Sequence, residues 1–255
     1  MNRPIRDWRE QRVWIIGASS GIGRTLAEAF LERGARVAVS ARREDALHRL
    51  AAARPKATVM AFDLIDRAAF ARAQDDLYQG WGGIDLVVFS AGAYAPMRTW
   101  ELDPTRLDEM LDINLRAPMA AAAHLIPLLL KQGGGSIAFV ASVAGYRGLP
   151  KAAAYGPTKA ALINFAETLY LDLELRGISV FLINPGFVAT PMTAGNDFAM
   201  PALISPQQAA EEIIAGFARG SFEIHFPRRF TGWLKLLRLL PYSLYFALVR
   251  RFTRL

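Results

Sequence analysis

The sequence contains no cysteine, so disulfide bonds and thiolate metal sites are excluded. Its three histidines, His48, His124 and His225, lie far apart in the chain, and no metal site is expected. No run of about twenty uncharged apolar residues occurs, so a membrane-spanning helix is not expected either. The charged N-terminus has no apolar stretch of the secretory type, which predicts a cytoplasmic protein.

Acidic residues are also missing from the last part of the chain. From Arg228 onward there is no acid but there are seven basic residues: Arg228, Arg229, Lys235, Arg238, Arg250, Arg251 and Arg254. Removing those seven from the 30 basic residues leaves 23, which equals the number of acidic residues. The formal net charge of +7 therefore belongs to the tail, and the remaining chain gives no reason to expect nucleic-acid binding.

What the sequence does contain is a regular alternation of short apolar runs and helical patterns. The runs predict strands at 13–17, 36–40, 58–62, 85–89, 136–141, 178–183 and 221–226. The helical patterns lie at 24–33, from about 66, and at 105–131, 155–176 and 206–219. This alternation predicts an α/β fold: a single domain with one doubly wound parallel sheet of the Rossmann type, which binds ligands beyond the carboxyl ends of its strands. We expect residues 1–228 to form the dinucleotide-binding and catalytic domain, and residues 229–255 a basic amphipathic helical tail.

The first predicted strand runs into a glycine-rich loop, G-A-S-S-G-I-G. Glycine lets the backbone turn tightly and approach a ligand closely. The helix that follows offers free N–H groups and the positive end of its dipole, which suit a pyrophosphate. Between a strand and a helix, this loop predicts a dinucleotide site. The expected contact residues are Gly17, Ser19, Ser20, Gly21, Ile22 and Gly23.

The second predicted strand is followed by Ser40-Ala-Arg-Arg43 and not by an acid. A carboxylate there would bind the ribose 2′-OH of NAD, whereas arginine pairs well with phosphate. We therefore expect NADP(H), bound by Arg42, in preference to NAD(H). The alternative is that both arginines are solvated residues at the start of a helix. Asp63, after the third strand, is expected to accept a hydrogen bond from the adenine amino group, or else to cap the helix near Asp66.

The stretch from Ser142 to Lys159 carries the side chains best suited to chemistry. Tyr155 and Lys159 are four positions apart, which places them on one face of a helix. An ammonium beside a phenol favours the phenolate, so we expect Lys159 to lower the pKa of Tyr155 from about 10. Ser142, after a predicted strand, could bind the same substrate oxygen. The set suits interconversion of a carbonyl and an alcohol, although a Tyr-x-x-x-Lys pair alone is typical of a solvated helix face.

Further small or polar residues follow the other strands. Ala91 and Gly92 would let a bulky cofactor lie close to the backbone. Asn114, inside a helical pattern, either opens the helix and presents a carbonyl or is a surface asparagine. Thr190 could bond the nicotinamide amide or the pyrophosphate, or else cap a helix before Pro191. The segment from Pro191 to Ser205 is a candidate substrate lid. The turn before it supplies the expected cofactor contacts Pro185, Gly186, Val188 and Thr190.

Taken together, these motifs resemble the short-chain dehydrogenase/reductase family over about residues 13–226. The order G-A-S-S-G-I-G, A-G, S with Y-x-x-x-K, and P-G-x-x-x-T is far more specific than any one of its parts. The sequence departs from the family pattern at two supporting positions, where Ile16 replaces threonine and Ser90 replaces asparagine.

The resemblance implies a tetrad of Asn114, Ser142, Tyr155 and Lys159. Tyr155 would be the acid in reduction and the base in oxidation, and Ser142 would hold the substrate oxygen. Lys159 would lower the tyrosine pKa and bind the nicotinamide ribose. Asn114 would hold a water that links Lys159 to solvent. Hydride would pass to or from the nicotinamide. The resemblance also implies association through the long helices near Asn114 and Tyr155, and we expect a homodimer.

The tail from Thr231 to Leu255 mixes basic residues with Leu, Phe, Tyr and Trp, and Pro241 divides it into two short helical segments. Basic amphipathic helices with aromatic residues commonly lie on a membrane surface. Alternatively, the tail covers its own substrate cleft or packs on a partner subunit. Each arrangement favours an apolar, lipid-like ketone or alcohol as substrate. The competing functions are a dinucleotide-binding redox sensor or scaffold docked by the tail and, less favoured, nucleic-acid binding.

Overall fold

Seven parallel strands form one sheet in the order β3-β2-β1-β4-β5-β6-β7. The computed structural model describes residues 1–253. The strands are β1 (Arg12–Ile16), β2 (Arg36–Ser40), β3 (Ala57–Val59), β4 (Leu86–Phe89), β5 (Gly135–Val140), β6 (Ile178–Pro185) and β7 (Glu223–Phe226). Because the chain turns back after β3 to place β4 beside β1, a crevice opens beyond the ends of those two strands. The predicted doubly wound parallel sheet is confirmed.

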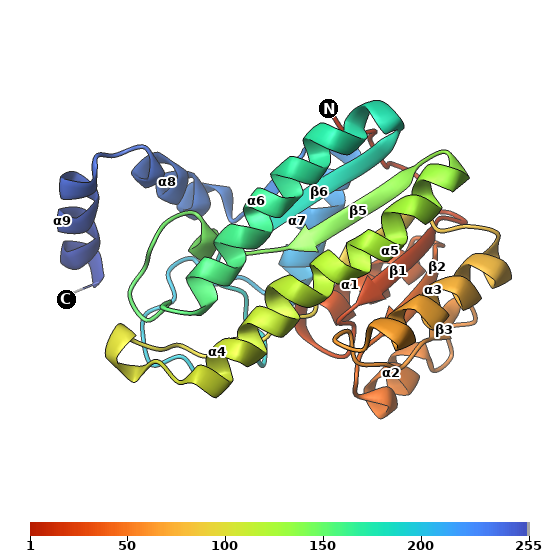
Figure 1. Ribbon diagram of the computed structural model, residues 1–255, viewed down its shortest axis with the longest axis horizontal. Coiled ribbons are helices and arrows are strands. Elements are labelled where there is room, and N and C mark those ends of the chain that lie inside the picture. The colour runs from red at the N-terminus through yellow and green to blue at the C-terminus, as the bar shows by residue number, and fades with distance from the viewer. Residues whose placement is uncertain (254–255) are drawn as a thin grey trace.

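Helices cover both faces of the sheet (Figure 1). One face carries α1 (Gly21–Glu32), α2 (Glu44–Ala51) and α7 (Pro206–Arg219). The other carries α3 (Arg67–Trp81), α5 (Ala117–Gln132) and α6 (Tyr155–Leu173). Short elements join these: α4 (Pro104–Leu111) and the one-turn segments η1 (Thr99–Glu101), η2 (Asp112–Arg116), η3 (Val143–Gly145) and η4 (Glu174–Arg176).

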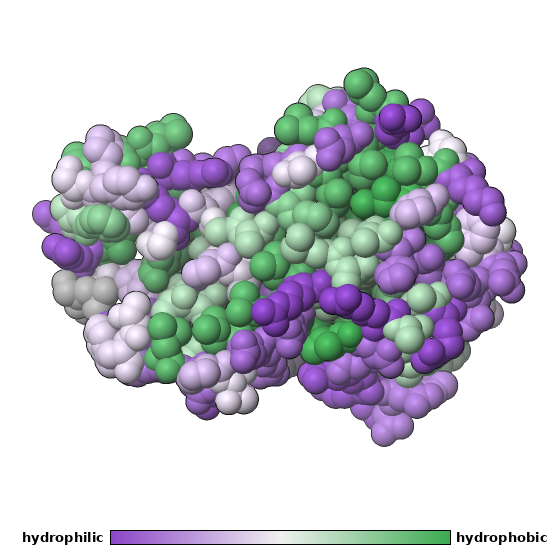
Figure 2. Space-filling model, viewed as in Figure 1, coloured by the Kyte–Doolittle hydropathy of each residue, from purple (hydrophilic) through white to green (hydrophobic). Residues whose placement is uncertain are grey.

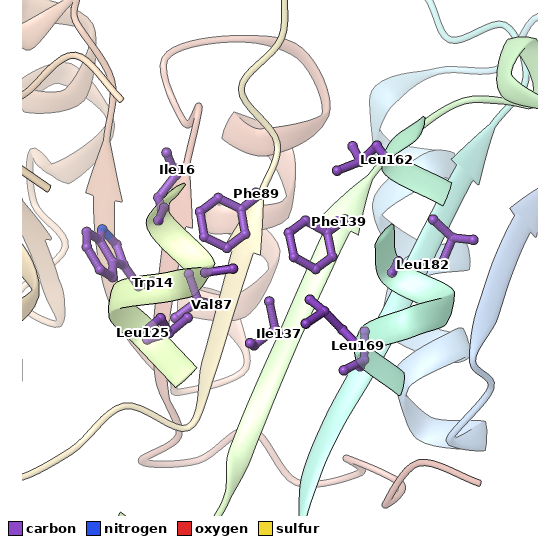
Figure 3. Packing of buried hydrophobic residues seen from close by; sticks show 14 of the residues in the cluster. Trp14, Ile16, Val87, Phe89, Leu125, Ile137, Phe139, Leu162, Leu169 and Leu182 are labelled. Atoms are coloured by element: carbon purple, nitrogen blue, oxygen red, sulfur yellow. The ribbon is translucent and has the colours of Figure 1, made fainter. Parts of the chain in front are cut away.

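The strands are almost continuously apolar because both of their faces are covered. On the α3–α5–α6 side, aromatic rings follow the sheet from β1 to β5 (Figure 3). Trp14 stacks on Phe70 with ring centroids 5.0 Å apart, and Phe89 stacks on Phe139 at 5.2 Å. The buried Trp14 indole donates to the Ser40 hydroxyl at 2.8 Å, which leaves its only polar atom satisfied. The core therefore holds the strand ends, and the loops that leave them, in fixed positions.

The main differences between the structure and the predictions concern β3, the helix at 105–131 and the cap of α3. β3 stops at Val59 instead of Phe62, as an edge strand paired on one side only. The single helix predicted for 105–131 is interrupted by η2, a π-helical turn. Asp66 caps α3 by accepting from the Ala69 N–H at 3.0 Å, so the interpretation of Asp63 as that cap is wrong.

The helical stretch Pro104–Gln132 is long and apolar enough, by length and composition alone, to cross a membrane. Its apolar side packs against the sheet through Ala121, Leu125 and Leu129, which are fully or almost fully buried. The core therefore accounts for one side of this stretch; 39% of its most apolar window is buried, and Met119 and Leu130 stay exposed.

The tail forms α8 (Arg228–Arg238) and α9 (Tyr242–Thr253), which project from one end of the molecule (Figure 1). Thr231 of α8 is fully buried, and Phe230 and Leu234 pack against the core. Outside these contacts the tail exposes large apolar side chains, among them Trp233 at 68%, Leu239 at 79% and Phe252 at 74%. Polar and apolar residues consequently alternate over its surface in Figure 2. The predicted division of domains after residue 228 coincides with the start of α8 and stays a prediction.

Candidate active site

The glycine-rich loop is pressed against the end of β4. Gly17 has a φ of +98°, and a Cβ placed on it would lie 2.4 Å from the Ala91 backbone nitrogen. A Cβ on Gly23 would lie 2.4 Å from the Gly17 carbonyl oxygen. Ser20 precedes α1 and, within the described part of the chain, does not cap that helix with its side chain. The first N–H groups of α1 are thereby left for a ligand.

Beyond the strand ends lies a cavity of about 380 Å³. Most of the residues predicted to bind a cofactor line it, although they come from the segments after five strands and from α6. They are Gly17, Ser19, Ser20, Ile22, Arg42, Asp63, Ala91, Gly92, Tyr155, Lys159, Pro185, Gly186, Val188 and Thr190. Gly21 and Gly23 are set behind this lining, where a Cβ on Gly21 would meet the Thr190 side chain at 3.1 Å. Close backbone packing, a free helix N-terminus and basic side chains at one rim are the features that a dinucleotide requires.

The two arginines after β2 lie at the rim of this cavity, and both are exposed. Arg43 donates to the Ser19 hydroxyl at 3.0 Å, which ties the end of β2 to the glycine-rich loop. Arg42 was the predicted ligand; Arg43 was not, because nothing in the sequence shows that it reaches Ser19. Both arginines are exposed at the start of α2, so the alternative of solvated helix residues stays open beside the contact of Arg43 with Ser19.

Ser142, Tyr155 and Lys159 line the same cavity. Ser142 follows β5, and Tyr155 begins α6, so Lys159 lies one turn along that helix. Lys159 is only 3% exposed; its Nζ donates to the Val140 carbonyl at 2.9 Å and lies 5.6 Å from the centre of the Tyr155 ring. A solvated helix face is therefore the wrong interpretation of the Tyr-x-x-x-Lys pair.

The expected lowering of the Tyr155 pKa by Lys159 is also wrong for this structure. Burial raises the pKa of Tyr155 to about 12, and hydrogen bonding to Ser142 opposes that rise only in part. Burial lowers the pKa of Lys159 to about 8. Each group is buried in a wall of the cavity, where its charged form is disfavoured; with a pKa of about 8, Lys159 still carries its charge at neutral pH.

Asn114 is 1% exposed, so the interpretation as a surface asparagine is wrong. It lies in the π-helical turn η2, which opens the helix as predicted. Its side chain donates to the Ala93 carbonyl at 2.9 Å and to Thr158 at 3.1 Å, and accepts from the Ala93 N–H at 2.8 Å. Asn114 thus joins the loop after β4 to the first turn of α6, behind the cavity and not in its lining.

The segment after Thr190 forms turns and not a helix, so Thr190 is not a helix cap. The Thr193 hydroxyl donates to the Val188 carbonyl at 2.6 Å and closes this turn against the cavity. Tyr94 packs edge-on against the Tyr155 ring at 4.8 Å and donates to Asn196 at 3.0 Å. Tyr94 and Asn196 are about a hundred residues apart and belong to no motif, so the sequence carried no signal for this contact.

Comparison with known proteins matches residues 11–199 to the family model described as short chain dehydrogenase. An uncharacterized oxidoreductase of Myxococcus xanthus is 34% identical over 241 residues, which cover 93% of this chain and 95% of that protein. One from Staphylococcus epidermidis is 31% identical over 214 residues, covering 84% and 93%.

Solved structures share the fold. A short-chain dehydrogenase from Streptomyces avermitilis superposes with a TM-score of 0.82 at 24% identity, covering 96% of this chain and 98% of that one. A short-chain dehydrogenase/reductase from Burkholderia phymatum, solved in complex with NAD, gives 0.81 at 23% identity, covering 91% and 94%. The chain belongs to the short-chain dehydrogenase family. It is an oxidoreductase of that kind, a family whose members use a nicotinamide dinucleotide.

Proposed function

We propose that the protein transfers hydride between NADP(H) and a carbonyl or secondary alcohol of an apolar substrate. The observation that carries this proposal is that Ser142, Tyr155 and Lys159 share one cavity with the glycine-rich loop. The nicotinamide cofactor supplies the hydride when bound. The residues of this chain bind the substrate, orient it and move its proton.

In reduction, the Tyr155 hydroxyl donates its proton to the carbonyl oxygen as negative charge develops there. With its pKa raised to about 12, Tyr155 carries that proton throughout the neutral range, which suits the role of acid. Ser142 holds the same oxygen through a hydrogen bond. Lys159, buried beside the phenol, supplies positive charge that stabilises the phenolate left behind.

Purified protein with NADPH and a panel of ketones tests this function against the Tyr155→Phe variant. The variant keeps the ring and loses the proton, so turnover should fall roughly 100- to 10,000-fold while NADPH affinity is unchanged. Equal turnover by the two proteins would overturn the assignment. Cofactor binding without turnover in the wild type would favour a dinucleotide sensor instead.

The preference for NADP(H) rests on Arg42 and Arg43, which line the cavity rim where no acid follows β2. A guanidinium pairs with a phosphate dianion through two parallel hydrogen bonds, whereas a ribose hydroxyl gains little from it. Arg42→Ala and Arg43→Ala should each weaken NADPH binding about tenfold and leave NADH binding within twofold. Tighter binding of NADH than NADPH by the wild type would contradict this preference.

An apolar, lipid-like substrate is supported by Met192 of the predicted lid, which lines the cavity and is 42% exposed. The predicted membrane contact is supported by the exposed apolar residues and the basic charge of α8 and α9, which complement an anionic lipid surface. On this proposal the protein is cytoplasmic and peripheral to a membrane. Turnover of short polar ketones only, with none of long-chain ones, would contradict the lipid-like substrate.

Vesicle sedimentation tests the membrane contact. Phosphatidylcholine vesicles with about one third phosphatidylglycerol should bind the protein, and binding should fall as salt rises. Arg250→Ala in α9 should weaken binding roughly fivefold, since a basic residue near an anionic surface contributes about 1 kcal/mol. Arg72→Ala on α3 is the matched control. Equal binding to pure phosphatidylcholine vesicles would contradict an electrostatic contact.

Homodimerisation is proposed through α5 and α6, where hydrophobic residues gather on the surface in Figure 2. Met119 and Leu130 on α5 are 41% and 43% exposed, and Leu171 on α6 is 76% exposed. Light scattering should give twice the chain mass for the wild type. Leu171→Glu should shift it towards the monomer, and a monomeric wild type would overturn the proposal.

A further inference from the structure

Three successive residues just after η3 contact the tail or the strand before it. Tyr146 donates its hydroxyl to Glu223 of β7, which is ion-paired with Lys235 of α8 at 2.5 Å. Two residues further along the chain, the Gly148 carbonyl accepts a hydrogen bond from the buried Tyr245 of α9 at 2.6 Å. The tail is therefore fastened to the active-site loop by defined polar contacts and not only by apolar packing.

Arg147, between these two, makes the largest set of contacts. The last carbonyls of a helix have no partner within it, and they lie at the negative end of its dipole. One guanidinium nitrogen of Arg147 donates to three carbonyl groups at the end of α8 and just beyond it, one of which, that of Leu237, also accepts from the Leu240 N–H at 3.2 Å. The acceptors are Leu237 at 3.2 Å, Arg238 at 3.2 Å and Leu240 at 2.7 Å.

The same guanidinium also lies over two aromatic rings of α9. Its carbon is 4.6 Å from the centre of the Tyr242 ring and 4.1 Å from that of Tyr245. Arg147 therefore joins the end of α8 to the start of α9, at the turn where Pro241 separates them. A lysine could supply the charge but not the planar group that stacks and donates at once.

The other end of this short loop is the catalytic serine. The Ser142 hydroxyl accepts from the Ala144 N–H at 3.1 Å, and its carbonyl accepts from the Gly145 N–H at 3.0 Å. A Cβ on Gly145 would lie 2.7 Å from the carbonyl carbon of Lys159, so η3 rests directly on α6. Only the 3₁₀ turn η3 separates Ser142 from the residues that contact the tail. A displacement of Arg147 is therefore expected to displace Ser142 as well.

We propose that the C-terminal tail positions the catalytic serine, and that Arg147 is the residue through which it acts. The tail would then help to hold the active site in place, in addition to providing the proposed membrane-binding surface. Arg147 is a positioning residue, because it reaches the substrate only through Ser142. This inference rests on the proposed reductase function, in which Ser142 holds the substrate oxygen.

The experiment is a double-mutant cycle on ketone reduction with NADPH. Arg147→Ala should lower kcat about 10- to 100-fold and leave the NADPH dissociation constant within twofold. In a Ser142→Ala background, the same substitution should change kcat less than twofold, because the residue it positions is gone. Equal effects in the two backgrounds would mean a general structural role and would overturn the proposal.

Two further variants sharpen the result. Tyr245→Phe removes only the hydroxyl bonded to Gly148 and should lower kcat two- to fivefold, which keeps the test available if Arg147→Ala folds poorly. Arg147→Lys should recover less than half of the lost activity. Arg72→Ala, on α3 at the opposite end of the molecule (Figure 1), should match the wild type. Wild-type activity in both Arg147→Ala and Tyr245→Phe would also overturn the proposal.

Hydrogen exchange separates this inference from the reductase function itself. If the wild type reduces no ketone, the proposed function fails, yet positioning can still be measured. Arg147→Ala should speed amide exchange at least tenfold in residues 142–149 and leave residues 155–173 unchanged. Unchanged exchange in residues 142–149 would overturn the positioning role independently of activity.

Discussion

The proposed cofactor side of the cavity and the neighbouring region proposed to receive the substrate are built in different ways. On the cofactor side, backbone meets backbone: Gly17 lies against Ala91, and Gly23 lies against Gly17, with no room for a Cβ at either position. On the substrate side, long side chains meet across the chain, as Tyr94 does with Asn196 and Arg147 with the end of α8.

The difference explains what each side can vary. A close backbone contact requires glycine whatever the ligand is. The proposed cofactor side is therefore encoded by a short local motif, the glycine-rich loop. A side-chain contact can be replaced by another pair of suitable size, so the substrate side can change its partners without changing the fold. In this protein the side-chain contacts on that side include those with the C-terminal tail, α8 and α9.

The largest effect is expected when one methyl group is added to the tightly packed backbone of the glycine-rich loop. Gly17→Ala places a Cβ 2.4 Å from the Ala91 nitrogen at a φ of +98°. Backbone strain and overpacking each cost about 1–3 kcal/mol. NADPH affinity should therefore fall 30-fold or more, or the free energy of unfolding should fall by the equivalent of about 2 kcal/mol or more. Fluorescence titration and urea unfolding measure the two.

Gly80→Ala on α3 is the matched control for that substitution. A Cβ there would meet no described atom within 4 Å, and alanine favours a helix over glycine. Stability should rise by about 0.5–1 kcal/mol with NADPH binding unchanged. If Gly17→Ala behaved like Gly80→Ala, the account of the cofactor side would be wrong.

A second test concerns the buried ammonium that both sides share. The pKa of Lys159 falls from 10.5 to about 8 on burial, so between these values the unfolded chain binds more protons than the folded protein. The free energy of unfolding should therefore rise with pH across this window. Lys159→Met lacks this term, and its stability relative to wild type should decline by about 2 kcal/mol between pH 7 and 9.5.

Urea unfolding of both proteins at several pH values measures this change. The range stops below pH 10, where Tyr155 would begin to act in the opposite direction because burial raises its pKa to about 12. A constant difference between Lys159→Met and wild type across the range would show that the burial of Lys159 does not disfavour its charge.

The smallest effect is expected on the substrate side. Tyr94→Phe removes the hydroxyl bonded to Asn196 at 3.0 Å but keeps the ring against Tyr155. One hydrogen bond contributes about 1 kcal/mol, so KM for the ketone should rise up to about fivefold with kcat within twofold. Tyr78→Phe on α3 is the control. A larger effect on kcat than on KM would place Tyr94 in the chemical step instead of in substrate binding.

The elements with local signals were predicted well from the sequence. β2 was predicted at its observed bounds, and so was α7, where Ser205 and Gln208 form a capping box around Pro206 and Gly220 ends the helix. Most of the residues expected around the cofactor were found around one cavity for the same reason, since most of them follow a strand and the strand ends meet at one edge.

The sequence could not show how deeply a side chain is buried, or which residues far apart in the chain are in contact. Charge alone predicted that Lys159 lowers the pKa of Tyr155, but the degree of burial decides the direction of the shift, and burial follows from packing. The contacts of Arg147 and Tyr94 span about a hundred residues and obey no spacing rule. They became visible only in the structure, which places α8, α9 and residues 191–205.

The π-helical turn at Asp112–Arg116 has a consequence for anyone who edits this chain. Such a turn accommodates one residue more than an ordinary helix would. Deleting a single residue there should restore regular winding while α4 and α5 keep nearly the same faces, because the widened turn already absorbs the extra residue. The loss would fall on the turn itself, where Asn114 holds the Ala93 backbone and Thr158.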